Sequence, residues 1–215
     1  MSDVTYNDGL ITIKQCYMTP IQEVCNAISM SLPSIFLTWL WSTQSLEFEP
    51  KFICISAWCH LSASFSYHML CAIDYFDCVI DNSLRKMDQS MVHVCCVAIA
   101  YALSKDVLYC VASASMNGWF IFRQWTPGPH NTAFERRTNI AISIFLSLLP
   151  AIVRGDYKNY FAALSSFVAA AFAFQMNHLF CGWGHSIQHL FYFPYIYFII
   201  EASKFTLPQA CEIPN

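Results

Sequence analysis

The sequence predicts an all-α membrane protein, built as a bundle of seven transmembrane helices. Of its 215 residues, 56% are hydrophobic and only 12% are charged, whereas soluble proteins carry roughly 25% charged residues. The mean hydropathy is +0.42, and long stretches of the chain carry no charge at all. A soluble helical protein of this length could not bury so many uncharged helices in one core. The chain therefore requires a lipid environment.

Two long uncharged runs predict the first two helices. Residues 24–46 and 52–73 contain no Asp, Glu, Lys or Arg. Each run is long enough to cross a hydrocarbon core of roughly 30 Å at about 1.5 Å per residue. We expect helices over residues 22–45 and 52–73. Residues 1–23 lack the basic region of a secretory signal peptide, so we expect the first helix itself to direct insertion.

Three shorter uncharged runs predict the next three helices. These runs are near the lower length limit, but the long basic side chains of Lys105, Arg123 and Arg154 can reach the membrane surface and extend them. A tight turn is expected at Lys105-Asp106, between the third and fourth helices. The helices are expected over residues 88–104, 106–123 and 138–154.

The last uncharged run, residues 159–200, is too long for a single crossing. Its natural break is Asn177–Gly184, where polar residues and two glycines interrupt the apolar pattern. This break gives two final helices, over residues 159–176 and 183–201. The expected organisation is an N-terminal segment at 1–21, the helical domain at 22–202 and a short tail at 203–215.

Charge and cysteine content limit the classes of partner. The net charge is −3 and no basic run is present, so nothing holds a nucleic acid electrostatically. The eleven Lys and Arg residues divide almost equally between the two membrane sides, so charge favours neither orientation. The eleven cysteines contain no CxxC pair, which argues against a thiolate metal site or a disulfide scaffold. Membrane lipids are the expected partners, with a homo-oligomer left open, in the plasma membrane, endoplasmic reticulum or Golgi.

Ionisable residues inside the helices are the candidates for function, because burying them in lipid is costly. His185-Ser-Ile-Gln-His189 places two imidazoles one turn apart on the same helix face. Ser64-Phe-Ser-Tyr-His68 likewise places a hydroxyl one turn before an imidazole. Asp88 opens the third helix. The remaining intramembrane histidines are expected to form ordinary interhelical hydrogen bonds: His60, His93 and His178.

The topology places these candidates at one depth. Even-numbered helices end, and odd-numbered helices begin, on the side of the N-terminus. His68 therefore approaches the same membrane face as Asp88, His185 and His189. Three imidazoles without a thiolate suit zinc, and three protein ligands leave the fourth position for water. In that arrangement Asp88 would act as a general base and Ser64 would stabilise an oxyanion.

These motifs resemble those of the CREST superfamily, which includes alkaline ceramidases, adiponectin/progestin receptors and myomaker-type proteins. The resemblance implies that His68, His185 and His189 bind zinc, with Ser64 and Asp88 as the accompanying polar pair. Tyr67-His68 followed by Cys78, Leu84 and Asp88 is most similar to the branch of myomaker and the GPI-processing phospholipase. The tail departs from the myomaker pattern because Cys211 is its single cysteine.

The function expected from this resemblance is zinc-dependent hydrolysis of an amide or ester bond in a lipid. Two alternatives remain open. The first is a myomaker-like protein for membrane remodelling or cell fusion, in which the zinc is structural. The second is a heptahelical receptor, which the helix count alone supports.

Overall fold

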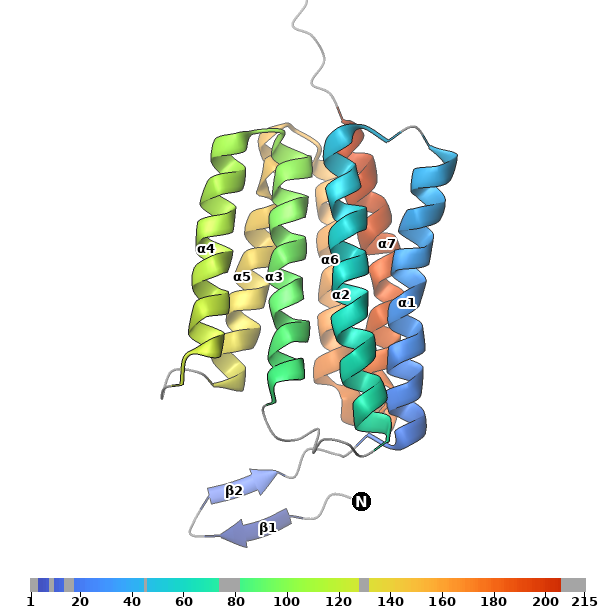
Figure 1. The fold of residues 1–215 in the computed structure, drawn as a ribbon, viewed down its shortest axis with the longest axis vertical. Coiled ribbons are helices and arrows are strands. Elements are labelled where there is room, and N and C mark those ends of the chain that lie inside the picture. The colour runs from blue at the N-terminus through green and yellow to red at the C-terminus, as the bar shows by residue number, and fades with distance from the viewer. Residues whose placement is uncertain are drawn as a thin grey trace, which may run out of the picture.

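The computed structural model describes residues 4–7, 10–13, 18–44, 46–73, 82–127 and 132–205. It contains a bundle of seven α-helices, preceded by an antiparallel hairpin within the predicted N-terminal segment (Figure 1). A short 3-10 helix, η1, joins the last two helices. The elements are β1 (Val4–Asn7), β2 (Leu10–Ile13), α1 (Pro20–Thr43), α2 (Phe48–Ala72), α3 (Ser83–Ser104), α4 (Val107–Trp125), α5 (Ala133–Val153), α6 (Tyr157–Gln175), η1 (Asn177–Phe180) and α7 (Gly184–Lys204).

The prediction of seven helices is confirmed, and most helices begin a few residues before the predicted start. The physical reason is that uncharged runs leave out polar first turns, which side-chain caps stabilise. Asn82 accepts a hydrogen bond from the backbone N–H of Arg85 at 2.8 Å and starts α3 ahead of Asp88. Thr19 and Gln22 form a reciprocal capping box at the start of α1. The predicted tight turn is also present, since Lys105 adopts φ 53° and Asp106 caps α4.

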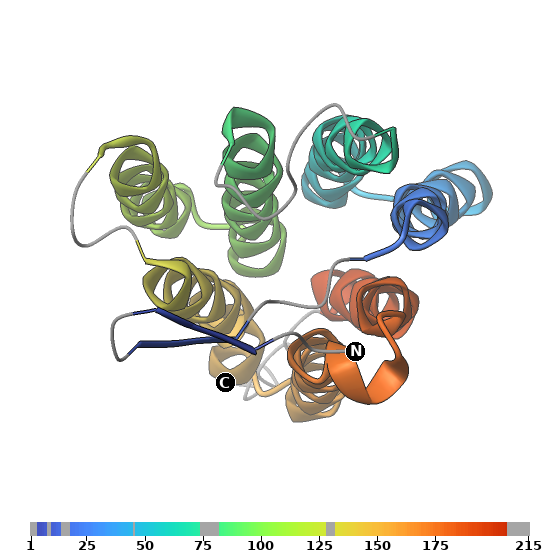
Figure 2. The same ribbon diagram turned by 90° about the horizontal axis from the view of Figure 1, so that it is seen from below.

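The helices form two rows around a common core. Viewed from below, α1 to α4 follow one another along one side, with α5, α6 and α7 along the other (Figure 2). The central residues of the core come from α1, α2, α3, α5, α6 and α7, and include Leu37, Leu103 and Ile199. The outer helix α4 packs on α3 and α5 and buries Asn117 and Gln124. Its attachment to the bundle is therefore partly polar.

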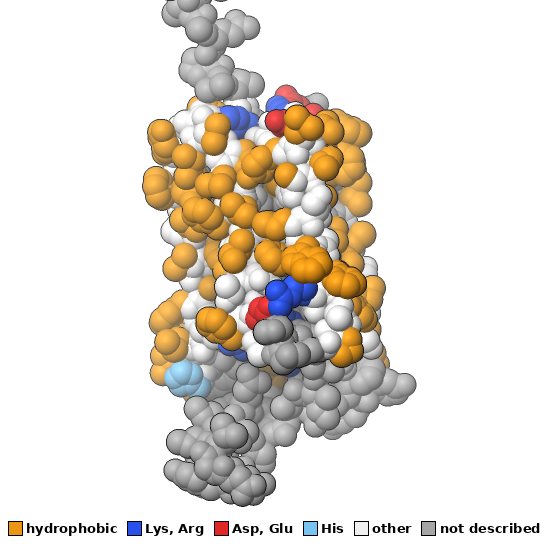
Figure 3. All heavy atoms as spheres, turned by 90° about the vertical axis from the view of Figure 1, so that its left-hand side faces the viewer, with side chains coloured by type: hydrophobic (Ala, Val, Ile, Leu, Met, Phe, Trp, Pro, Cys, Tyr) orange, Lys and Arg blue, Asp and Glu red, His pale blue; other side chains and the backbone are white. Residues whose placement is uncertain are grey.

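The outer surface of the bundle is apolar. The helices α1, α3 and α5 are each long and apolar enough to cross a membrane. On the face that carries α4, hydrophobic side chains cover the middle and charged ones lie toward the two ends (Figure 3). Each of the seven helices exposes at least one large hydrophobic residue at 38% or more: Trp39, Phe65, Val94, Val111, Phe145, Val168 and Leu190. These features indicate a membrane protein; that all seven helices cross stays a prediction.

Two cysteines of the described helices serve as packing residues in the core. Cys54 and Cys96 are buried as free thiols in the core, as expected for small apolar side chains. Cys71, in the last turn of α2, is instead disulfide-bonded. The disulfide is a feature that the spacing of the cysteines along the sequence does not predict.

The predicted break between the last two helices is confirmed, and two glycines allow it. Gly182 has φ +89°, a left-handed conformation that favours glycine. A Cβ on Gly184 would lie 2.2 Å from the backbone oxygen of Ala173 and 2.8 Å from the Cα of Asn177. Glycine at this position therefore lets α7 begin against the end of α6.

We expect Gly184→Ala to lower the stability of the bundle by about 1–3 kcal/mol, because the methyl group collides with backbone that cannot move aside. Gly118→Ala is the matched control, since a Cβ there meets nothing within 4 Å. In the interior of α4 that alanine is expected to stabilise by up to about 1 kcal/mol. Thermal unfolding midpoints in detergent provide the measurement. Equal midpoints for the two variants would show that the close approach at Gly184 is unimportant.

Candidate metal centre

The fold brings three predicted ligands, His68, His185 and His189, into one cluster. His68 lies in the last turns of α2, and the other two lie in the first turns of α7. The ring centroids are 4.7 Å apart for His68–His185, 4.8 Å for His185–His189 and 6.3 Å for His68–His189. Both helix ends lie at the end of the bundle where α1 begins (Figure 1). The structure thus places the three histidines at one end of the bundle, and their depth in a membrane stays a prediction.

The distances between the three ring centroids are close to those of imidazoles that bind one metal ion. Imidazoles bound to one tetrahedral zinc at about 2.0–2.1 Å place their ring centroids about 5 Å apart. Two of the three distances match this value, and the His68–His189 pair is about 1 Å too wide. Within the described part of the chain, no set of three His, Cys, Asp or Glu side chains already has the geometry of a metal site. Binding zinc would therefore require a small closure of α2 on α7.

The orientation of His68 leaves one ring nitrogen available. Its Nδ1 lies 2.6 Å from Oε2 of Glu23, and both side chains are almost fully buried. Because a carboxylate only accepts, Nδ1 carries the proton and donates it. The opposite nitrogen, Nε2, is buried and has no hydrogen-bond partner among the described residues. A carboxylate that orients a histidine in this way is a recurrent feature around zinc ligands.

His189 is oriented in the same way by Ser29. The Ser29 hydroxyl donates to the backbone oxygen of Asn26 at 3.1 Å and lies 2.8 Å from Nδ1 of His189. Since the hydroxyl has one hydrogen, it accepts the Nδ1 proton of His189. His68 and His189 thus both protonate Nδ1 and keep the lone pair on Nε2, the form that a metal ligand requires.

Helix α1 therefore supports the cluster, and sequence reasoning missed its contribution. Ser186 donates to Oδ1 of Asn26 at 2.6 Å, and Gln22 donates to the carbonyl of Cys181 at 2.8 Å. A usable signal was present, because Glu23, Asn26 and Ser29 recur every three residues and lie along one face of a helix. The helix expected over residues 22–45 already contained Glu23, but the spacing along the chain does not show that this face turns toward His68 and His189.

Asp88 and Ser64 are not assembled around the three imidazoles. The Asp88 carboxylate accepts a hydrogen bond from Nε2 of His60 at 3.2 Å, while remaining within electrostatic range of His68 and His185. Ser64 is buried one turn before His68 on α2. In the described part of the chain, its hydroxyl makes no hydrogen bond to an imidazole. The catalytic roles of Asp88 and Ser64 stay predictions.

The other three histidines have different fates. His60 and His93 form the expected interhelical hydrogen bonds, His60 to Asp88 and His93 to Asn117 at 2.8 Å. The prediction for His178 is wrong, because this residue is exposed in η1, the short 3-10 helix that joins α6 to α7.

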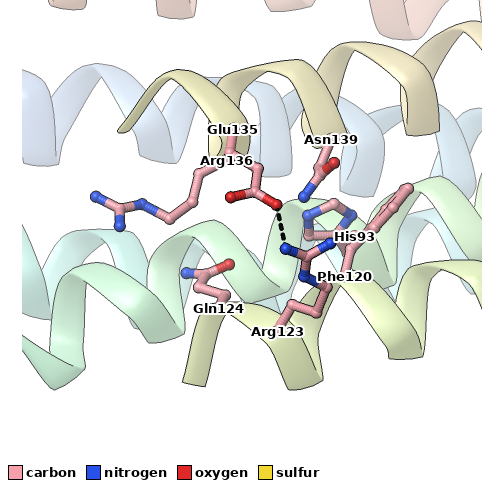
Figure 4. Close-up of a pocket in the computed structure, with 7 residues that line it drawn as sticks. All are labelled: His93, Phe120, Arg123, Gln124, Glu135, Arg136 and Asn139. Carbon is pink, nitrogen blue, oxygen red and sulfur yellow. Dashed lines mark ion pairs between the residues drawn. The ribbon is translucent and has the colours of Figure 1, made fainter. Parts of the chain in front are cut away.

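A small polar pocket lies beside His93, where α3, α4 and α5 meet (Figure 4). Its volume is about 10 Å³, enough for about one water molecule. Figure 4 shows the guanidinium of Arg123 pointing to the carboxylate of Glu135, with an N–O distance of 2.6 Å. The pocket is too small for a lipid or a cofactor, and we assign it to packing.

A larger cavity, about 650 Å³, opens between α2, α3 and α4. Its walls are apolar and include Phe52, Val97 and Val111, with Asn117 and His93 at one end. None of the three clustered imidazoles lines it. It is a separate feature from the candidate metal centre.

Comparison of the chain with protein families, curated proteins and solved structures gives no match. The case for a function therefore depends on the site itself.

Proposed function

We propose that this chain is a seven-span membrane protein that holds zinc on His68, His185 and His189 and hydrolyses an amide or ester bond of a membrane lipid. The observation that carries the proposal is the buried Nε2 of His68. It has no hydrogen-bond partner among the described residues and belongs to a cluster of three imidazoles. A buried lone pair without a partner costs free energy, and a metal ion would remove that cost.

Hydrolysis at this site would need a zinc ion, a water molecule and one carboxylate. Zinc would supply Lewis acidity and lower the pKa of a water molecule toward about 7. At such a centre the water oxygen would bond to the carbonyl carbon of the lipid while the proton of the water passed to a nearby base. The bond from this carbon to the leaving nitrogen or oxygen would then break, and the leaving atom would take up that proton. Asp88, near His68 and His185, is the carboxylate available to carry that proton. Glu23 and Ser29 hold two imidazoles in place throughout.

The test is release of product from lipids in detergent micelles. Wild-type protein loaded with zinc is expected to release free fatty acid from ceramides or glycerolipids, and His189→Ala to lose that release by at least about a hundredfold. Asn159→Ala is the control, because Asn159 lies at the opposite end of the bundle, in the first turn of α6. Equal release by wild type and His189→Ala would exclude this centre as the source of activity.

A second function, the myomaker-like one with a structural zinc, has one observation in its favour. Asp88 is hydrogen-bonded to His60 rather than directed at the three imidazoles, so the expected catalytic pair is not in place. The same three ligands would then join α2 to α7 as a cross-link. Fusion or remodelling of cells that express the chain, with zinc bound and no lipid hydrolysis, would establish this alternative.

A further inference from the structure

The cavity of about 650 Å³ between α2, α3 and α4 opens onto the outer surface of the bundle. Helix α3 lies between α2 and α4 in one row of helices (Figure 2), so α3 forms the floor of the cavity and the other two form its walls. One lining residue of each helix is well exposed: Ile55 at 51%, Val94 at 38% and Val111 at 56%. The cavity is therefore an open groove on the apolar surface of the bundle, and we call it the outer groove.

The polar side chains at the outer groove bond within the protein. His93 and Asn117 are hydrogen-bonded to each other at 2.8 Å, and the amide nitrogen of Asn117 donates to the carbonyl of Ser113 at 2.9 Å. The Ser56 hydroxyl donates to the carbonyl of Ile53 at 3.0 Å. The volume lies within the roughly 300–1,000 Å³ of pockets that hold small ligands. An apolar space of this kind excludes water and takes up apolar molecules.

The outer groove occupies one half of the bundle, away from the candidate metal centre. Its lining residues run from Phe52 to Cys59 on α2 and from His93 to Tyr101 on α3. At about 1.5 Å per residue, these stretches are about 11–12 Å long. One leaflet contributes about 15 Å to a hydrocarbon core of roughly 30 Å. The length of the groove therefore suits an acyl chain of one leaflet, whereas a transmembrane helix of another protein would cross both halves.

Helix α4 leaves the outer groove open because it presents small side chains there. Cys110, Ala114 and Gly118 follow one another at intervals of four residues and line the groove. A Cβ on Gly118 would meet nothing within 4 Å. The buried residues of α4 are Asn117 and Gln124, both polar. Van der Waals packing and hydrogen bonds hold helices together in lipid, so an apolar molecule in the groove would supply packing that α4 otherwise lacks.

We propose that the outer groove binds an acyl chain of a membrane phospholipid from the leaflet opposite the candidate metal centre. The groove begins at Val107, which follows Asp106 at the start of α4, and Lys105 forms an ion pair with Glu47 at the same end. Both signs of charge are present there, which suits a zwitterionic headgroup. The acyl chain would lie along α3 and join α2 to α4. This lipid site goes beyond the proposed function and does not depend on it.

The experiment uses a phosphatidylcholine that carries a photoreactive diazirine in its acyl chain. The protein is reconstituted in vesicles that contain this lipid, extracted in detergent to remove loosely associated lipid, and then irradiated. Mass spectrometry of the digested protein locates the labelled residues. In the wild type we expect the label on the stretches of α2, α3 and α4 that line the outer groove.

Two variants of α4 form a matched pair. Ala114→Phe places a ring in the outer groove and should lower the labelling there by about tenfold or more, because the ring and the acyl chain cannot share one space. Ala112→Phe adds the same ring at an exposed position outside the groove and should keep the labelling. Gly118→Leu is the second groove variant and should also lose the label, since its new Cβ meets no protein atom within 4 Å.

The remaining outcomes separate this proposal from its rivals. Label spread evenly over the outer surface of the wild type would identify ordinary bilayer lipid and overturn the proposal. Unchanged labelling in both Ala114→Phe and Gly118→Leu would overturn it as well. A change of oligomeric state in Ala114→Phe, with the label unchanged, would assign the groove to a second copy of the chain instead. His189→Ala should keep the labelling, so loss of the proposed hydrolysis would leave this result intact.

Discussion

The His185→Ala/His189→Ala variant is expected to contain no zinc, whereas the wild type purified in detergent should contain about one zinc ion per chain. The two residues supply two of the three nitrogens of the candidate centre, with ring centroids 4.8 Å apart. A single remaining imidazole on His68 cannot retain the ion through purification. Elemental analysis of both proteins measures the effect.

His178→Ala is the control for this experiment, because His178 lies just before α7 and is exposed. It should keep the zinc content of the wild type. Well-folded wild-type protein without zinc, after loading with the metal, would contradict the metal centre. The three histidines would then be residues that pack α2 against α7.

Glu23→Gln is expected to weaken zinc binding by about 10- to 100-fold while leaving the fold intact. The carboxylate accepts the Nδ1 proton of His68 at 2.6 Å in a site where both groups are buried. Glutamine has nearly the same size, but it is neutral and its amide makes a weaker acceptor. The imidazole would therefore be less basic and less firmly held in the tautomer that presents Nε2.

Competition with a zinc chelator, followed in detergent solution, measures this effect. Glu201→Gln is the matched control, because Glu201 forms an ion pair with Lys204 near the end of α7, away from the histidines. An unchanged affinity in Glu23→Gln would limit Glu23 to a packing role. A loss of zinc in both variants would indicate a general effect of charge.

The depth of the site could be predicted from the sequence because connectivity alone determines it. Successive helices cross in opposite directions, so the end of α2 and the starts of α3 and α7 lie at one end of the bundle. His68, His185 and His189 meet there for that reason. The break at Gly182–Gly184 could also be predicted from the sequence, because its two glycines interrupt the apolar run. In the structure, a left-handed conformation and a close backbone contact require these glycines.

The rotation of each helix about its own axis was not predictable. A helix that is apolar on all sides has no distinct hydrophobic face. The sequence pattern therefore does not show which of its polar residues faces inward. Packing turns Asp88 toward His60 and turns Glu23 toward His68. Both pairings join different helices, and neither follows from spacing along the chain.

By itself, the sequence determined the helical class, the number and approximate positions of the helices and the end of the bundle where the polar residues gather. Uncharged runs, caps and glycines are local features, and the alternation of direction follows from them. Only the tertiary structure decided which nitrogen of His68 is left without a partner among the described residues, and that α1 supplies the groups that orient His68 and His189. Those choices depend on contacts between residues far apart in the chain, such as Ser29 and His189, and the free energy of such contacts is set only when the helices pack.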